Sequence, residues 1–325
     1  MAASPHGLLA ARAPSTPPLS TARLQRLAVL GVAVAVLTWG CSNVMIKAVP
    51  VSGLVASFYR LWFSIPLLWL VLLAQPQVRA RLDRDWLRAA LIGGALFALH
   101  QVLFFSALKQ TTVANVTLIG ALQPTLVLLV AGRWFGERSG GRAIAWSLVA
   151  VGGTALVIAG ATGVRGWSPV GDLLATANLF AFTAYFLASK RIRRSTGATE
   201  YVIGLTTVAG LIMLVICVAS GEQLLSPRGG DWLVLLALAL LPGTLGHFLT
   251  NWAHAHTSAF AVSIMLLAVP LVAMGGAALV LGERLSPLQL VGAAIVLVAV
   301  AAVVLSQSPR RAEALAGSAA ETDAP

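Results

Sequence analysis

The chain has 325 residues, of which 58% are hydrophobic and only 10% charged, and its mean hydropathy is +0.88. Soluble domains are roughly 45–50% apolar and about 25% charged, so the composition excludes an ordinary soluble protein and predicts an all-α membrane protein. The net charge of +11 is not gathered on a soluble basic face, which excludes nucleic-acid binding.

In chain order, residues 1–24 are rich in Pro, Ser, Thr and Ala and are predicted to form a disordered cytoplasmic N-terminus. A helix that crosses about 30 Å of hydrocarbon needs roughly 20 apolar residues. The first apolar run is longer than the core of a secretory signal peptide, the alternative at this position, so a retained span is predicted. Residues 307–325 are predicted to form a disordered cytoplasmic C-terminus. Ten segments meet the length requirement: 27–46, 53–74, 88–108, 111–132, 142–161, 171–189, 201–219, 232–253, 258–281 and 287–306.

Lysine and arginine are distributed unequally between the two sets of connecting loops. If the N-terminus is cytoplasmic, 15 of these residues fall on the cytoplasmic side and 5 on the outside. Because cytoplasmic loops of membrane proteins are enriched in Lys and Arg, both termini are predicted to be cytoplasmic. The excess of Arg over Lys indicates a GC-rich bacterial genome, and hence a multi-pass protein of the cell membrane.

One pattern occurs twice, 146 residues apart: a proline followed twelve positions later by Gly-Glu-Arg. The copies are Pro124 with 136–138 and Pro270 with 282–284. Internal repeats in a membrane protein are typical of transporters. Each repeat contains five predicted spans, and this odd number gives the two repeats opposite orientations in the membrane. The repeats are assigned to residues 25–161 and 162–306.

The register of the repeat extends further, since 105–112 aligns with 251–258 at the same offset. With this repeat and the pattern of Trp39, Asn43 and Lys47 in the first span, the chain resembles the EamA-type ten-span members of the drug/metabolite transporter superfamily. The resemblance covers all of the predicted spans. It implies movement of a metabolite or drug, often by efflux, through a central cavity between the two halves.

Three prolines lie near the middle of predicted spans: Pro124, Pro242 and Pro270. Each removes a backbone donor and crowds the carbonyl four residues earlier, so each predicts a kink whose freed carbonyl must find a partner. A hinge that lines a cavity and a static kink satisfied by neighbouring helices are both compatible with this pattern.

Arg60 is the only cation placed well inside a predicted span. A guanidinium at that depth costs at least about 2.5–3.5 kcal/mol on insertion scales, so it should face the protein interior and hold a partner. Its forked geometry fits a substrate carboxylate or phosphate. The alternative is a structural role, in which Arg60 bonds freed backbone carbonyls or extends to the membrane interface.

Acidic residues fall only in loops, tails or helix ends, so the buried carboxylate of a typical proton relay is missing. His100 and His247 are the titratable groups left inside spans, and a hydrogen-bonded interior role is the alternative for each. This pattern favours a uniporter, or an antiporter whose proton binds a histidine or the substrate.

His247, Asn251 and His254 share one helical face, and His100 and Gln101 lie at the corresponding depth of the other repeat. The two faces are predicted to line one cavity from opposite sides, with interhelical hydrogen bonding as the alternative for each polar residue. No carboxylate or thiolate joins the histidines at liganding spacing, so neither a metal nor a cofactor is expected. The predicted substrate-binding set is Trp39, Asn43, Tyr59, Arg60, His100, Gln101, Asn115, Gln123, His247 and Asn251.

Glu137 and Glu283 each end a helix and are interpreted as structural residues of a turn. Ser139 and Ser286 are each predicted to cap the helix that follows, with Pro287 at the first position of the second of these helices. Small residues near the last helix of each repeat predict close helix packing and leave room for a homodimer. They are Gly152, Gly153, Gly160, Gly275 and Gly276.

The leading interpretation is a secondary transporter that moves a small metabolite by alternating access. An amino acid or related zwitterion is the first candidate, because Arg60 can face a carboxylate. No H-E-x-x-H, no G-x-S-x-G in a span and no paired carboxylates are present, so an enzyme is not predicted. A non-transporting membrane sensor or scaffold with a carrier fold is the alternative. The expected partners are a small-molecule substrate and the lipid bilayer.

Overall fold

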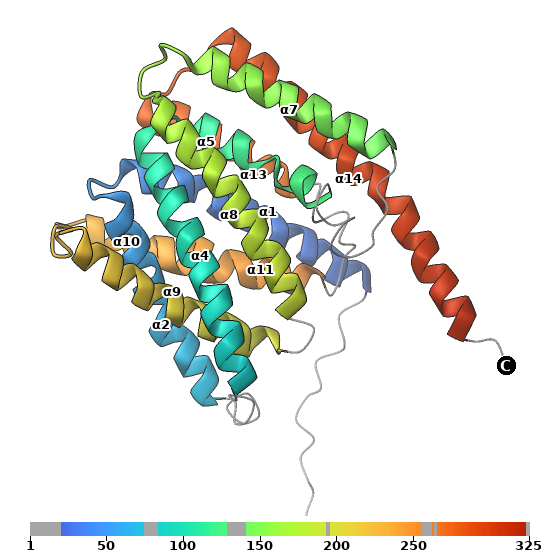
Figure 1. Cartoon of the computed structure of the whole chain (residues 1–325), viewed down its shortest axis with the longest axis horizontal. Helices are drawn as coiled ribbons and strands as arrows, with labels where there is room; N and C mark the ends of the chain where they lie inside the picture. Colours follow the sequence, from blue (N-terminus) through green and yellow to red (C-terminus); the bar gives the residue numbers. More distant parts are fainter. Residues whose placement is uncertain are drawn as a thin grey trace, which may run out of the picture.

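The computed structural model describes residues 21–74, 84–128, 141–192, 196–254, 262 and 265–322, and every element in these ranges is helical (Figure 1). The elements are α1 (Thr21–Ala48), α2 (Gly53–Ala74), α4 (Arg84–Gln110), α5 (Val113–Gly120), α7 (Gly141–Ala161), α8 (Pro169–Ile192), α9 (Ala198–Ala219), α10 (Asp231–Leu240), η1 (Leu241–Gly246), α11 (His247–His254), α13 (Ala268–Gly276), η2 (Ala277–Leu281) and α14 (Pro287–Thr322).

Eight helices of the described residues are long and apolar enough to cross a membrane, and they begin or end within a few residues of eight predicted spans. Large apolar side chains such as Leu148, Val215 and Leu233 are exposed on them, as expected for surfaces that face lipid. The predicted spans 111–132 and 258–281 contain two shorter apolar helices and include residues outside the described ranges. The chain is therefore a multi-pass membrane protein.

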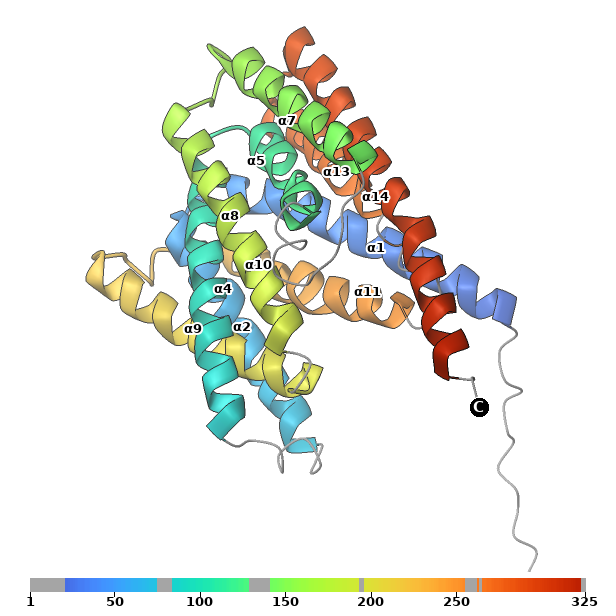
Figure 2. The same cartoon turned by 45° about the vertical axis from the view of Figure 1, so that its right-hand side comes forward.

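Two groups of helices flank a central one (Figures 1 and 2). On one side α7 and α14 pack against each other along their length, and on the other side α4 packs against α8 and α9, while α2 packs against α9. Between them, α1 contacts α13, η1 and α11. The largest cluster of buried apolar residues lies where these groups meet, and includes Val49, Phe105, Leu118 and Leu238.

Glycines allow α7 and α14 to approach closely. A Cβ at Gly153 would lie 2.8 Å from Ile295 Cγ2, and one at Gly292 would lie 2.8 Å from the carbonyl oxygen of Gly153. Near the end of α7, Gly160 accepts a hydrogen bond from Ser286 Oγ at 2.7 Å, just before α14 begins. The two helices therefore run antiparallel, with backbones too close for side chains at the contact points.

The α-helical pattern is interrupted near all three prolines. A turn at Ala121–Leu122 follows α5 and precedes Pro124, and a turn at Leu267 precedes Pro270. Ala121 and Leu267 are 146 residues apart, which is the spacing of the sequence repeat. Pro242 lies in the π-helical segment η1, which joins α10 to α11. The loss of a backbone donor and the crowding of the preceding turn account for these interruptions.

The last helix extends beyond the predicted span. α14 continues through residues 307–322, which the sequence predicts to be disordered. This stretch is rich in Ala, Arg and Glu, whose high helix propensity allows the helix to continue after the apolar run has ended. At the other terminus α1 begins at Thr21, inside the predicted N-terminal segment, and residues 1–20 lie outside the described ranges.

Candidate functional site

Arg60 of α2 lies beside Gln101 of α4 in the interior of the bundle. Its Nη1 donates a hydrogen bond to Gln101 Oε1 at 3.2 Å, and its guanidinium carbon lies 5.7 Å from the centre of the Phe105 ring. Gln101 and Phe105 are fully buried. No carboxylate of the described residues lies within ion-pair distance of Arg60. Because a guanidinium has five N–H donors, the bond to Gln101 leaves Arg60 able to bind a further acceptor.

Several buried polar atoms have no hydrogen-bond partner among the described residues. They include Asn43 Oδ1, Ser57 Oγ, Gln101 Nε2 and Thr125 Oγ1. Buried polar groups are almost always paired, because an unpaired one costs about 1–3 kcal/mol. Gln101 is especially informative, since its Oε1 is held by Arg60 while its Nε2 remains available. The sequence pointed to Asn43 and Gln101 but not to Ser57 or Thr125, because a hydroxyl in an apolar run usually bonds its own helix.

His100 is held by a residue that the sequence did not single out. Its Nδ1 lies 2.7 Å from Asn178 Oδ1 of α8, and its ring lies 4.7 Å from that of Phe182 and 5.6 Å from that of Phe104, centre to centre. Its position is therefore fixed by the packing of α4 on α8. The side chains of His247 and Asn251 on α11 lie outside the described part of the chain.

Trp39 and Tyr59 each bond a backbone carbonyl that is distant along the chain. Trp39 Nε1 donates to the carbonyl oxygen of Pro242 in η1 at 2.9 Å, so an aromatic donor satisfies part of the interrupted helix. Tyr59 Oη donates to the carbonyl oxygen of Leu224 at 2.7 Å, and its ring packs edge to face against Trp232. Asn43 Nδ2 bonds the carbonyl of Trp39 on its own helix at 2.9 Å.

Asn115 lies near the start of α5, and its amide is fully used. Its Nδ2 donates to both carboxylate oxygens of Asp172 at 2.9 Å, and its Oδ1 accepts from Gln289 Nε2 at 3.1 Å. The structure therefore places Asn115 in an interhelical network. Gln123 is partly buried on the helical segment that follows α5.

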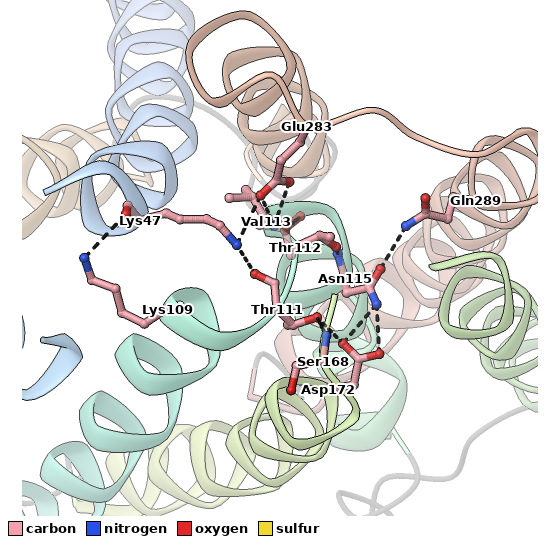
Figure 3. A network of polar contacts seen from close by, with 11 residues as sticks. Lys47, Lys109, Thr111, Thr112, Val113, Asn115, Ser168, Asp172, Glu283 and Gln289 are labelled. Carbon is pink, nitrogen blue, oxygen red and sulfur yellow. Dashed lines mark hydrogen bonds and ion pairs between the residues drawn. The ribbon is translucent and has the colours of Figure 1, made fainter. Parts of the chain in front are cut away.

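Glu283 also lies in a network of contacts, shown in Figure 3. Its carboxylate forms an ion pair with Lys47 Nζ at 3.2 Å and accepts from the backbone N–H of Val113 at 3.0 Å. Ser286 caps α14 as predicted, since Gln289 N donates to its Oγ at 3.1 Å and its own N–H donates to Gln289 Oε1. Glu137 and Ser139 lie outside the described residues.

No metal centre competes with this site within the described residues. No group of three or more His, Cys, Asp or Glu side chains in them could hold a metal ion. A surface groove of about 290 Å³ lies between α7 and α14 and is lined by Trp146, Val149, Ala294, Ile295 and Val298. None of these is a predicted binding residue, and their apolar character fits contact with lipid.

Comparisons with known proteins agree with this architecture. A family model described as "EamA-like transporter family" matches residues 26–159 and again residues 169–305. An aromatic amino acid exporter, YddG, from Ancylobacter novellus is 32% identical over 152 residues, which are 46% of this chain and 52% of the exporter. The chain thus aligns with about half the length of that relative.

A solved crystal structure superposes with a TM-score of 0.60 at 22% identity, covering 86% of this chain and 97% of the other. At that identity it supports the fold alone. The two family matches together span most of the described helices and coincide with the two sequence repeats. The chain belongs to the EamA-like transporter family.

Proposed function

We propose that this protein is a secondary transporter that exports a small zwitterion, with aromatic amino acids as the first candidates, across the bacterial cell membrane by alternating access. The observation that carries the proposal is the pair Arg60 and Gln101, a partly buried guanidinium with unused donors next to a buried amide whose nitrogen is unpaired. A transporter of this family needs a site inside the bundle that recognises a polar solute, and this pair provides one.

Ten spans arranged as two inverted five-helix repeats are part of the proposal. Helices in corresponding positions of the repeats run antiparallel where they meet, since α7 pairs with α14, and α2 with α9. In the second pair, Trp62 Nε1 donates to the Gly210 carbonyl at 3.0 Å, and Trp69 Nε1 to Thr207 Oγ1 at 3.0 Å. Contacts also recur between repeats, because α1 packs on α13 and α11 while α8 packs on α5 and α4. Opposed repeats of this kind support rocking about a shared site.

The substrate class follows from the groups around Arg60. The guanidinium suits a carboxylate, which it can bind through two parallel hydrogen bonds. The amide of Gln101 offers a further donor, and Phe105 provides an apolar surface below the guanidinium. The related exporter of aromatic amino acids adds support for this class. Absence of an acidic partner for Arg60 among the described residues favours an anionic group on the substrate over a cationic drug.

Counterflow into liposomes tests the proposal directly. Purified protein is reconstituted with unlabelled phenylalanine inside, and uptake of labelled phenylalanine, tryptophan, a sugar and a cationic drug is measured from outside. Transient accumulation of the aromatic amino acids alone is expected. Uptake of every solute at the same level as in protein-free liposomes would contradict transport. A pH gradient imposed in the same assay separates the two coupling modes, because a uniporter ignores it and a proton antiporter does not.

A further inference from the structure

We propose that the contacts around the start of α5 form a latch that closes one end of the transport path. This inference rests on the proposed function and concerns a different part of the molecule from the Arg60 site. The latch is defined as Lys47, Thr111, Asn115, Asp172 and Glu283, with the N-terminus of α5 at its centre (Figure 3).

The two carboxylates of the latch join one repeat to the other. Glu283 of the second repeat accepts from Val113 N at 3.0 Å and pairs with Lys47 Nζ at 3.2 Å. Asp172, also of the second repeat, accepts from Thr111 Oγ1 at 2.8 Å and from Asn115 Nδ2 at 2.9 Å. The start of α5 is thus held from two directions. If the repeats rock relative to each other, these are the bonds that must break for this end to open.

The charges of the latch match the helix ends that they occupy. Lys47 is in the last turn of α1, where a positive charge is favoured, and its Nζ also bonds the Thr111 carbonyl. Glu283 faces the first N–H of α5, and Asp172 is in the first turn of α8, where negative charges are favoured. Lys109 in the last turn of α4 bonds the carbonyl oxygen of Val49. Four helix termini are therefore neutralised together when the end is closed.

The Lys47–Glu283 pair is suited to open as well as to close. Both side chains are mostly but not fully buried, with 18% and 10% of their surfaces exposed. Water can therefore solvate both charges once the helices separate, whereas removal of one partner leaves the other charge buried and unpaired. Asp172 by contrast is 5% exposed and also accepts from Trp167 Nε1 at 2.8 Å. The ion pair is the part of the latch that a single substitution should release.

Cysteine accessibility on α5 measures closure without measuring transport. Val116 is 2% exposed and lies one turn beyond Val113. The α5 reporter is Val116→Cys in a chain carrying Cys41→Ala and Cys217→Ala, labelled with a membrane-impermeant maleimide in right-side-out and inside-out vesicles. The α9 reporter is Leu205→Cys in the same background. Leu205 is equally buried but remote from the latch, so this second reporter detects general unfolding.

Glu283→Gln and Lys47→Gln are each expected to raise the labelling rate of the α5 reporter at least about tenfold from one membrane side, while the α9 reporter stays protected. In Glu283→Gln the side-chain oxygen can still accept the hydrogen bond from Val113 N, so the variant removes the charge and keeps the cap of α5. A tenfold change corresponds to about 1.4 kcal/mol in the closed-to-open equilibrium. Arg284→Gln and Glu222→Gln serve as matched controls, and should leave both rates unchanged.

Unchanged labelling of the α5 reporter in both variants would overturn the latch, even if counterflow succeeds. Faster labelling of both reporters together would also overturn it, because the contacts would then hold the fold and not an opening. Should Glu283→Gln not fold, Lys47→Gln alone decides between these results. If the wild type fails to transport but the two substitutions still speed the labelling of the α5 reporter, the proposed function is rejected and the latch is retained.

Discussion

Two kinds of buried polar residue can be distinguished in this protein by how completely they are paired. Asn115 uses its amide nitrogen and its oxygen within a closed interhelical network, as expected for a residue that fixes helix positions. Gln101 has one end held by Arg60 and the other unpaired. Incomplete pairing at such depth is expensive, which makes Gln101 and Arg60 better candidates for solute contact than Asn115.

Arg60→Gln is expected to weaken substrate binding. Loss of hydrogen bonds to a charged carboxylate costs about 1.5–3 kcal/mol, which corresponds to a roughly 10- to 150-fold rise in the half-saturation concentration for counterflow. Arg60→Lys keeps the charge but loses the fork, so an intermediate effect is expected. The comparison is made at matched protein density in liposomes. A half-saturation concentration for Arg60→Gln equal to that of the wild type would show that Arg60 has a structural role instead.

Asp172→Asn is expected to destabilise the protein more than a similar change at the surface. The Asp172 carboxylate accepts hydrogen bonds from Thr111, Asn115 and Trp167. The substitution leaves at least one of these buried donors without a partner, at a cost of about 1–3 kcal/mol. The measurement is thermal unfolding in detergent. Asp231→Asn is the control, because Asp231 also begins a helix but its bond to Arg228 N is exposed; equal shifts in melting temperature would contradict the assignment.

Single polar residues could be recognised from the sequence, but their partners could not. Arg60 stood out because no other cation lies well inside a predicted span, and its partner Gln101 was named for its depth. His100 was named without Asn178, and Asn115 was assigned to the substrate site although Asp172 and Gln289 enclose it. These partners are 57 to 174 residues away along the chain. Only the packing of α4, α5, α8 and α14 brings them together, and no local pattern encodes it.

At the scale of elements, hydropathy and length located the long helices well, since both are set by the thickness of a bilayer. The proline-linked interruptions were also visible, because they follow from the chemistry of a single residue. The full extent of α14 was not visible in the sequence, because hydropathy carries no information about a helix that continues outside the membrane. Glycine spacing indicated close packing but not the partner, which the structure identifies for Gly153 as α14.

Gly153→Leu is expected to separate α7 from α14 and lower the thermal stability. Even a Cβ at this position would lie 2.8 Å from Ile295 and 3.1 Å from Val296, so a full side chain must displace the neighbouring helix. Overpacking of this kind typically costs about 1–3 kcal/mol. Gly152→Leu is a matched control on the adjacent residue, since a Cβ there meets nothing within 4 Å. A melting temperature lowered equally by both would point to the loss of glycine itself and not to the contact.

For the whole molecule, the sequence repeat and the helix contacts lead to one arrangement. The start of α1 and the end of α14 lie at the same end of the bundle, and the latch lies at the opposite end (Figures 1 and 2). If the termini face the cytoplasm, as the distribution of Lys and Arg predicts, the latch lies toward the outside. The protein would then be closed to the exterior in this conformation, the state in which an exporter accepts its substrate from the cell.

Thiol labelling in intact cells tests this orientation. Leu225 is 87% exposed in the loop between α9 and α10, so Leu225→Cys in the background lacking Cys41 and Cys217 is expected to react with an impermeant maleimide before permeabilisation. Gln25→Cys, at an exposed position near the start of α1, should react only after the membrane is opened, because the termini are expected to face the cytoplasm. Reaction of both sites from the outside would require an even number of membrane crossings between them in place of the odd number predicted. That result would remove the inverted repeat, and with it the physical basis for alternating access.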